Sequence, residues 1–262
     1  MKKLIFLALA LSLCAVSYGQ IRIGGRSINV DKAVSAASDV VSAVTLTDDD
    51  VTKLCREAIE WMDENNPVLP EDEETYGARL KRLTEGLENY KGLDLNFKVY
   101  HVVDVNAFAC GDGSIRVFST LMDYMTDEEL LGVIGHEIGH IYNTDVKDAI
   151  KTAYMTSAAI NAAGAAGGTV GQLSNSQLGE LVNSFTNSQF SQKQEFAADD
   201  FCLQFCVDNN ITPYAMAMSL DKLVELFGSS ESTKVAKMFS SHPDSEKRAV
   251  RARQLADKHT GN

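Results

Sequence analysis

The chain has 262 residues, of which 45% are apolar and 23% are charged. This composition is typical of one sizeable globular domain and excludes a disordered or fibrous protein. It carries 24 basic and 36 acidic side chains. So acidic a surface argues against nucleic acid and anionic lipid as main partners, because both carry negative charge.

The N-terminus is predicted to be a signal peptide covering residues 1–19. A basic start (MKK) precedes an apolar run over residues 4–16, and residues 17–19 (SYG) form a small-x-small cleavage site. The run is shorter than the roughly 20 residues of a membrane span. Removing residues 1–19 deletes two lysines and no acids, so the mature charge is 22 − 36 = −14. We expect an exported, periplasmic protein, with secretion or a lipid anchor through Cys14 as weaker alternatives and membrane association possible but not expected.

The next segments predict helix followed by a small sheet. Residues 41–90 are expected to be helical, with an interruption from Pro67 to Pro70. Residues 95–103 (LNFKVYHVV) alternate and are rich in β-formers, which predicts a strand. Residues 107–118 (AFACGDGSIRVF) predict two short strands around a Gly-Asp-Gly turn.

A long helix is predicted to start near Thr126. Thr126 and Glu129 have the spacing of a capping box, and the acidic residues between them suit the positive first turn of a helix. This helix carries the stretch GVIGHEIGHIYNTD, which begins at Gly132. The stretch places two of the chain's five histidines four residues apart, with a glutamate between them.

That spacing predicts a metal site. His136 and His140 lie on one helical face and can both direct a nitrogen at one zinc ion, each at about 2.0–2.1 Å. Glu137 lies one residue round the helix, beside the metal, where a base can take a proton from metal-bound water. The alternative is a buried helix whose histidines have this spacing by coincidence.

A third ligand is predicted in the stretch QKQEFAADDFCLQFC. Glu195 lies in a window that favours helix and is a candidate carboxylate ligand, and Asp199, one turn on, could orient a ligand histidine. Cys202 and Cys206 continue the same stripe and are expected to be buried thiols that pack against the HExxH helix. The alternative for both carboxylates is a solvated acidic face.

These motifs together resemble peptidase family M48, the gluzincin metallopeptidases. The resemblance rests on HEIGH, on EFAAD, on SSHPDSEKR and on the stretch NAFACGDGSIRVF, and it runs from about residue 95 to residue 255. It is nearest to the soluble, exported bacterial members often called zinc proteases with chaperone function. The resemblance implies an α+β, mainly α fold, with a zincin-like HExxH helix beside a small sheet and a second ligand-bearing helix.

The resemblance also implies roles for individual residues. His136, His140 and Glu195 would bind one zinc ion per chain, Glu137 would be the general base and acid, and Asp199 would orient a ligand. Within this single domain of residues 20–262, we expect an N-terminal helical part over residues 20–94 and a catalytic core over residues 95–258.

Two further motifs gain meaning from the same comparison. His242 and Pro243 precede a predicted helix that contains Arg248, as in the family's C-terminal motif. His242 would stabilise an oxyanion or occupy the zinc's open position in a resting state, and Arg248 would hold substrate or brace a carboxylate. Asp244 or Ser245 is the candidate cap of this predicted helix. The alternative is a surface loop with a helix-start proline and a structural arginine.

A peptide-binding strand is the last candidate. Asn106, Ala107, Phe108 and Ala109 are predicted to form an edge strand that binds an extended peptide through backbone hydrogen bonds. An ordinary sheet strand is the alternative. Residues 152–179 contain no charged side chain and are rich in small residues. They predict part of a helical hairpin and a possible lid rather than a membrane span.

The function predicted from these residues is zinc-dependent endopeptidase activity on unfolded or misassembled cell-envelope proteins, with zinc-bound water activated by Glu137. The expected partners are unfolded protein or peptide substrates and no nucleic acid. The main alternative is a zinc-containing periplasmic chaperone or assembly factor with latent or no proteolysis. A zinc hydrolase with a non-peptide substrate has no supporting feature.

Overall fold

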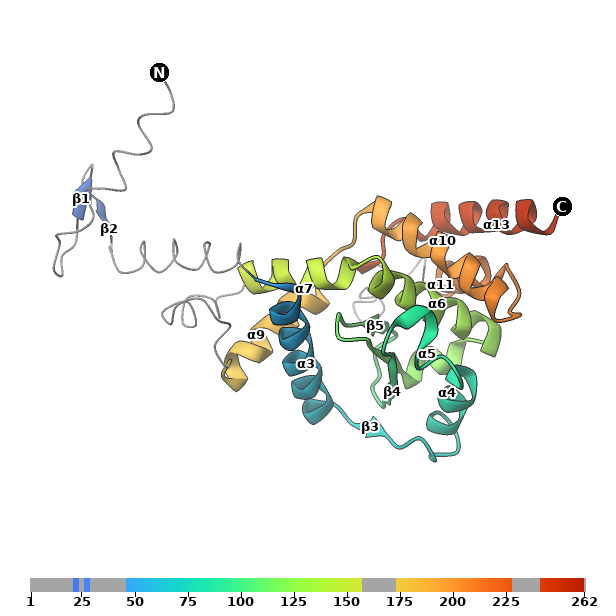
Figure 1. The fold of residues 1–262 in the computed structure, drawn as a ribbon, viewed down its shortest axis with the longest axis horizontal. Coiled ribbons are helices and arrows are strands. Elements are labelled where there is room, and N and C mark those ends of the chain that lie inside the picture. Colours follow the sequence, from blue (N-terminus) through green and yellow to red (C-terminus); the bar gives the residue numbers. More distant parts are fainter. Residues whose placement is uncertain (1–20, 24–25, 29–45, 157–172, 228–240, 262) are drawn as a thin grey trace, which may run out of the picture.

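The computed structural model describes residues 21–23, 26–28, 46–156, 173–227 and 241–261 (Figure 1). The predicted signal peptide and the glycine-rich residues 157–172 lie outside this part of the chain. In chain order the elements are β1 (Ile21–Ile23), β2 (Arg26–Ile28), α3 (Asp48–Asn65), β3 (Val68–Leu69), α4 (Gly77–Thr84), η1 (Tyr90–Gly92), β4 (Asn96–Tyr100), β5 (Ala107–Ala109), β6 (Ser114–Phe118), α5 (Ser119–Tyr124), α6 (Asp127–Tyr142), α7 (Asp145–Thr156), α9 (Asn175–Thr186), α10 (Gln192–Asp208), α11 (Ala215–Phe227) and α13 (Ser245–Thr260). The expected mainly helical α+β fold is confirmed.

The sheet has the order β3-β4-β6-β5. β4 and β6 are parallel neighbours, whereas β3 pairs antiparallel with β4 and β5 antiparallel with β6. The predicted pair of short strands around the Gly-Asp-Gly turn is therefore present, and β5 is an edge strand. Gly113 has a φ of 97°, and a Cβ there would lie 1.8 Å from the Asp94 carbonyl oxygen, so only glycine suits this turn.

Two groups of helices flank the sheet (Figure 1). α6 packs against α10 and α11, and α13 packs against α10 and α11 in turn. On the other side, α3, α7 and α9 pack on one another around a second apolar cluster that includes Tyr100 and Cys110 of the sheet region. α7 and α9 thus form the two helical sides of the predicted hairpin.

α6 begins where the capping pattern predicts. The Thr126 hydroxyl accepts a hydrogen bond from the Glu129 N–H, and the Glu129 carboxylate accepts one from the Thr126 N–H. Such caps typically stabilise a helix by about 1 kcal/mol. The helix is buried over most of its length, which small residues make possible. A Cβ on Gly132 would lie 2.7 Å from the Ala215 carbonyl oxygen, so this glycine allows α11 to approach closely.

The N-terminal part, predicted to be helical over residues 20–94, also contains strands, because β1 and β2 pair antiparallel and β3 lies within the predicted interruption. The interruption after Asn66 is not a plain loop, because β3 adds to the sheet there, with Leu69 opposite Val99. Pro70 then ends the strand, since it has no N–H to donate to a ladder. A partly buried ion pair joins α3 to the sheet, with Arg116 of β6 donating to Asp63 at 2.8 and 3.0 Å.

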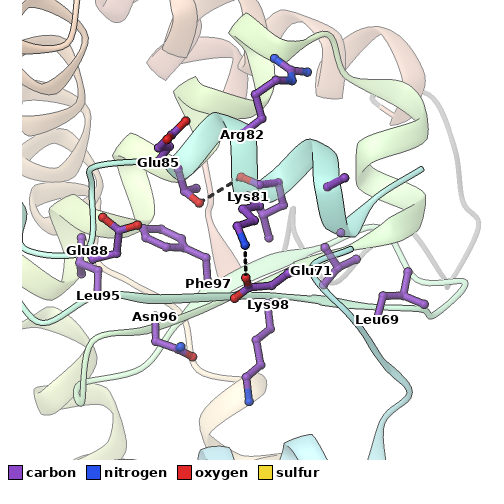
Figure 2. A pocket seen from close by; sticks show the side chains of 15 residues that line it. Leu69, Glu71, Lys81, Arg82, Glu85, Glu88, Leu95, Asn96, Phe97 and Lys98 are labelled. Atoms are coloured by element: carbon purple, nitrogen blue, oxygen red, sulfur yellow. Dashed lines mark hydrogen bonds and ion pairs between the residues drawn. The ribbon is translucent and has the colours of Figure 1, made fainter. Parts of the chain in front are cut away.

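A hollow of about 530 Å³ lies between α4 and the outer side of β4 (Figure 2). Leu80, Leu95 and Phe97 contribute apolar surface, and an ion pair of 2.9 Å joins two other lining side chains, Lys81 and Glu71. This hollow is at the opposite end of the sheet from β5. No helix among the described residues has the length and apolarity needed to cross a membrane.

Candidate active site

α6 presents the two motif histidines on its buried face. His136 and His140 are one helical turn apart, and their Nε2 atoms lie 3.0 Å from each other. Both side chains are shielded from solvent, with 3% and 0% of their surfaces exposed. Phe190 stacks on the His140 ring, with centroids 4.0 Å apart, and so fixes the plane of that imidazole.

α10 supplies the carboxylates. Its N-terminus is fixed by a capping box between Ser191 and Gln194, which sets the first turn in which Glu195 lies. The Glu195 carboxylate is 3.5 Å from His136 Nε2 and 3.6 Å from His140 Nε2. The predicted packing of Cys202 against the HExxH helix is confirmed, because its thiol donates to the Gly132 carbonyl at 3.2 Å.

His242 joins the same group from the chain segment before α13. Its Nδ1 is 3.1 Å from Glu195 Oε1 and 3.3 Å from His136 Nε2. Asp244 occupies the N-cap position of α13, as predicted, with a φ of 63°. Its side chain makes no capping hydrogen bond, so only the position of the predicted cap is confirmed. Its carboxylate instead accepts a hydrogen bond from Gln192 at 2.7 Å, which ties this turn to α10.

The spacing of the four donor side chains fits one zinc ion. The ligand atoms of His136, His140, Glu195 and His242 all lie within 4.8 Å of one another, and all four residues are buried. Two atoms bonded to one zinc at about 2.0–2.1 Å and at the tetrahedral angle lie roughly 3.3 Å apart. The separations of 3.0 to 3.6 Å between these donors bracket that value. Imidazole and carboxylate are also the donors that zinc prefers.

Glu137 lies beside this group but is not part of it. The residue is 1% exposed, and its Oε1 atom has no hydrogen-bond partner among the described residues. Nε2 of His242 lies 3.6 Å from this atom. A buried carboxylate oxygen without a partner is costly, so this atom is available to a water or substrate proton.

Asp199 and Arg248 form a buried ion pair behind the histidines. Asp199 Oδ1 is 3.0 Å from His136 Nδ1, and Arg248 donates to the same carboxylate at 2.7 and 3.0 Å. Burial opposes ionisation of Asp199, but hydrogen bonds from His136 and Arg248 outweigh it and hold its pKa at about 2. The carboxylate therefore stays charged and fixes the tautomer of His136.

The position of Arg248 bears on its two predicted roles. The side chain is 1% exposed and also contacts the Glu195 carboxylate. It is thus enclosed by the carboxylates of α10, which is the contact that the carboxylate-bracing alternative predicts.

Two residues near the histidines were missed from the sequence. The first, Asp145, accepts a hydrogen bond from His140 Nδ1 at 2.9 Å and is 6% exposed. Its signal was present in the motif stretch, as an acid five residues after His140. The intervening Thr144 has a φ of 64°, a left-handed turn that no local pattern predicts. The second, Phe190, has no signal in sequence at all.

The edge strand β5 borders a small cavity at the site. Asn106 to Ala109 line it together with Glu137, Phe185, Phe190 and His242. The hydrogen bonds of Asn106 and Cys110 to β6 fix the alternation along β5. The N–H and C=O groups of Ala107 and Ala109 therefore point away from β6, at an edge where both residues are buried beside this cavity.

Comparison with known proteins agrees with this geometry. The model of a family described as "Peptidase family M48" matches residues 77–256. The chain is similar to Metalloprotease LoiP of Escherichia coli K12, with 40% identity over 248 residues, 94% of this chain and 96% of the relative. It is 35% identical over 227 residues to Metalloprotease YcaL of the same strain, which covers 86% of this chain and 87% of the relative. A Protease HtpX homolog of Persephonella marina is 25% identical over 191 residues, or 58% of this chain and 65% of that protein.

Proposed function

This chain belongs to peptidase family M48, and from that membership we propose that it is a zinc-dependent endopeptidase of unfolded or misassembled cell-envelope proteins. The observation that carries the proposal is the buried group of His136, His140, Glu195 and His242 beside Glu137, whose Oε1 atom has no hydrogen-bond partner among the described residues. A pure binding protein would need the metal ligands but no free base next to them.

The three ligands from α6 and α10 would hold zinc, which supplies a Lewis acid that lowers the pKa of water and polarises a carbonyl group. Glu137 accepts a proton from the attacking water at Oε1. It then delivers that proton to the leaving nitrogen of the cleaved peptide bond. Asp199 and Asp145 keep the two helix histidines in the tautomer that leaves Nε2 free to bind.

The substrate is proposed to bind as an extended strand along β5. The outward N–H and C=O groups of Ala107 and Ala109 would pair with the peptide backbone, which gives affinity with little sequence preference. An unfolded segment can present its backbone in this way, whereas most backbone groups of a folded protein are already paired. This difference supports unfolded or misassembled proteins as the substrate class, and the predicted signal peptide supports a location in the envelope.

His242 is proposed to act in a resting state of the enzyme. It lies as close to His136 and Glu195 as the zinc ligands lie to each other. As a fourth donor it would fill the position that a water must take for hydrolysis, so the resting enzyme would be latent. The same contact keeps the second candidate function open, a zinc-containing chaperone without proteolysis.

Hydrolysis of casein by the mature chain, with bound zinc quantified in parallel, tests the proposal. The wild type is expected to bind about one zinc ion and to cleave casein. The Glu137→Gln variant should keep its metal and lose cleavage. If neither the wild type nor His242→Ala cleaves although both bind zinc, the chaperone alternative replaces the peptidase.

A further inference from the structure

The four cysteines of the described residues are buried free thiols that form two neighbouring pairs. Cys55 of α3 lies against Cys110, which follows β5, whereas Cys202 and Cys206 are both on α10. We propose that Cys55 and Cys110 form a disulfide bond in the exported protein, and that Cys202 and Cys206 remain thiols. The inference shares only the prediction of export with the proposed function.

In the first pair, each cysteine lies in contact with the other residue or with its chain neighbour. The Cys110 thiol donates to the Cys55 carbonyl oxygen at 3.6 Å. A Cβ placed on Gly111, the neighbour of Cys110, would lie 2.9 Å from the Cys55 sulfur, so the glycine makes room for that thiol. Both cysteines are 0% exposed and belong to the apolar cluster under α3.

The second pair has the wrong geometry for a bond. Residues four apart on a helix have Cβ atoms about 5–6 Å from each other. A disulfide requires a Cβ separation of about 3.5–4.5 Å. Cys202 and Cys206 lie in the continuous helix α10, which would have to deform to bring them together. Since α10 also carries Glu195, such a deformation would displace a proposed zinc ligand.

The bond forms by exchange with a disulfide oxidant, such as an oxidising thiol–disulfide protein of the envelope or glutathione disulfide. The thiolate of one cysteine attacks a sulfur of the oxidant, which releases one oxidant thiol and leaves a mixed disulfide. The other cysteine attacks the protein-side sulfur, the Cys55–Cys110 bond forms, and the second oxidant thiol leaves. Two protons and two electrons pass from the cysteines to the oxidant.

The surroundings place this reaction during folding. A hydrogen bond with Cys55 and burial raise the pKa of the Cys110 thiol well above its usual range. The thiolate is the reactive form, so the folded thiol reacts slowly. Once formed, the bond would join α3 to the end of β5, across 55 positions of sequence. The end of the edge strand β5, which borders the active site, would then be anchored covalently to the helix group of α3, α7 and α9.

Refolding of the full mature chain in a glutathione redox buffer, followed by alkylation and peptide mapping without reductant, tests the proposal. We expect one cross-linked peptide containing Cys55 and Cys110, a loss of two hydrogen atoms in mass, and alkylated Cys202 and Cys206. Four alkylated cysteines, or Cys55 joined to any other cysteine, would overturn the inference. Cys202→Ser is the matched control and should leave the cross-link unchanged.

Reduction provides a second readout that does not depend on variants. The oxidised wild type should unfold at a higher urea concentration than the same protein after reduction, because the bond restricts the unfolded chain. Cys55→Ser with Cys110→Ser should show no shift on reduction. Casein hydrolysis by a protein that retains four thiols would leave the peptidase proposal intact and refute the disulfide alone. A bond that forms in glutathione but is absent from the cellular protein would refute its presence in the exported protein.

Discussion

The Nδ1 atom of His140 lies 2.9 Å from a carboxylate oxygen of Asp145, the first residue of α7. The left-handed turn at Thr144 bends the chain between α6 and α7 and brings the carboxylate under the imidazole. An Nδ1–H donated to Asp145 leaves Nε2 unprotonated, which is the form that binds a metal. Asp145 is therefore a positioning residue for the proposed zinc site.

Replacing Asp145 should weaken zinc binding more than it changes the fold. We expect Asp145→Ala to lower zinc affinity by about 10–100-fold, the usual effect of losing such a carboxylate. Isothermal titration of the metal-free protein with zinc measures this directly. Asp145→Asn can still accept the hydrogen bond through its amide oxygen and should retain part of the affinity.

Asp148 provides the control, because it lies one turn further along α7 and is exposed. Asp148→Asn removes one negative charge from the same helix without touching His140. Asp148→Asn should bind zinc as the wild type does. If Asp145→Ala also binds zinc with wild-type affinity, the hydrogen bond to His140 has no role in metal binding.

His242 gives the second prediction. Its position 3.3 Å from His136 and 3.1 Å from Glu195 is that of a competing ligand. We expect His242→Ala to accelerate casein hydrolysis on the order of tenfold, because the imidazole would no longer compete with water for the zinc. A tenfold change corresponds to about 1.4 kcal/mol. Zinc affinity should fall in the same variant, since one donor is lost.

His259 lies exposed on α13 and serves as the matched control, because His259→Ala removes a histidine from the same region. Its rate should equal that of the wild type. A loss of activity in His242→Ala with zinc still bound would instead assign the histidine to stabilisation of the oxyanion.

The helices that carry the site could be predicted because their signals are local. The capping box at Thr126 and Glu129 and the i, i+4 spacing of the histidines are visible in a few consecutive residues. The same holds for the helix that carries Glu195. Such patterns depend on hydrogen bonds and side-chain geometry within two turns of helix, so no tertiary information is needed.

The contacts between distant segments could not be predicted in the same way. Arg248 is enclosed by Glu195 and Asp199, about fifty residues earlier, and nothing in its own neighbourhood indicates that burial. The pairing of Phe190 with Ser241 through a 3.2 Å backbone hydrogen bond is equally non-local. These contacts depend on how α10 and α13 pack, which a single sequence does not specify.

The edge strand gives the third prediction. The N–H of Ala107 points away from β6, so Ala107→Pro removes a donor to the substrate and none to the sheet. Proline is tolerated at the first residue of an edge strand. One lost hydrogen bond costs about 1 kcal/mol, so kcat/KM for a peptide should fall roughly fivefold. Thermal unfolding of the variant should match the wild type.

Phe108→Pro is the contrasting variant, because the N–H of Phe108 bonds to β6 opposite Arg116. It should lower stability and activity together. Equal kcat/KM for Ala107→Pro and the wild type would mean that the substrate does not pair with this edge of β5.

The fourth prediction concerns stability and pH. Asp63 of α3 accepts hydrogen bonds from Arg116, Lys98 and Tyr100. Burial raises its pKa, but these three donors outweigh burial and hold the pKa below the ordinary value of 3.8. As the pH falls, the carboxyl of Asp63 therefore takes up its proton at a lower pH in the folded chain than in the unfolded chain.

A depressed folded-state pKa stabilises the protein above the unfolded value, and that contribution disappears as the pH falls through the folded value. We expect Asp63→Asn to lower the free energy of unfolding by about 2 kcal/mol at pH 7, the scale of a charged hydrogen bond. Urea unfolding at several pH values should show this difference shrinking below pH 3.8. Just below pH 3.8 the unfolded chain protonates this carboxyl while the folded chain still holds it ionised, so the stabilisation shrinks. Below the lower folded-state pKa the wild-type carboxyl is protonated in both states and resembles the amide. A difference that stays constant from pH 7 to pH 3 would mean that the loss comes from packing and not from the charge of Asp63.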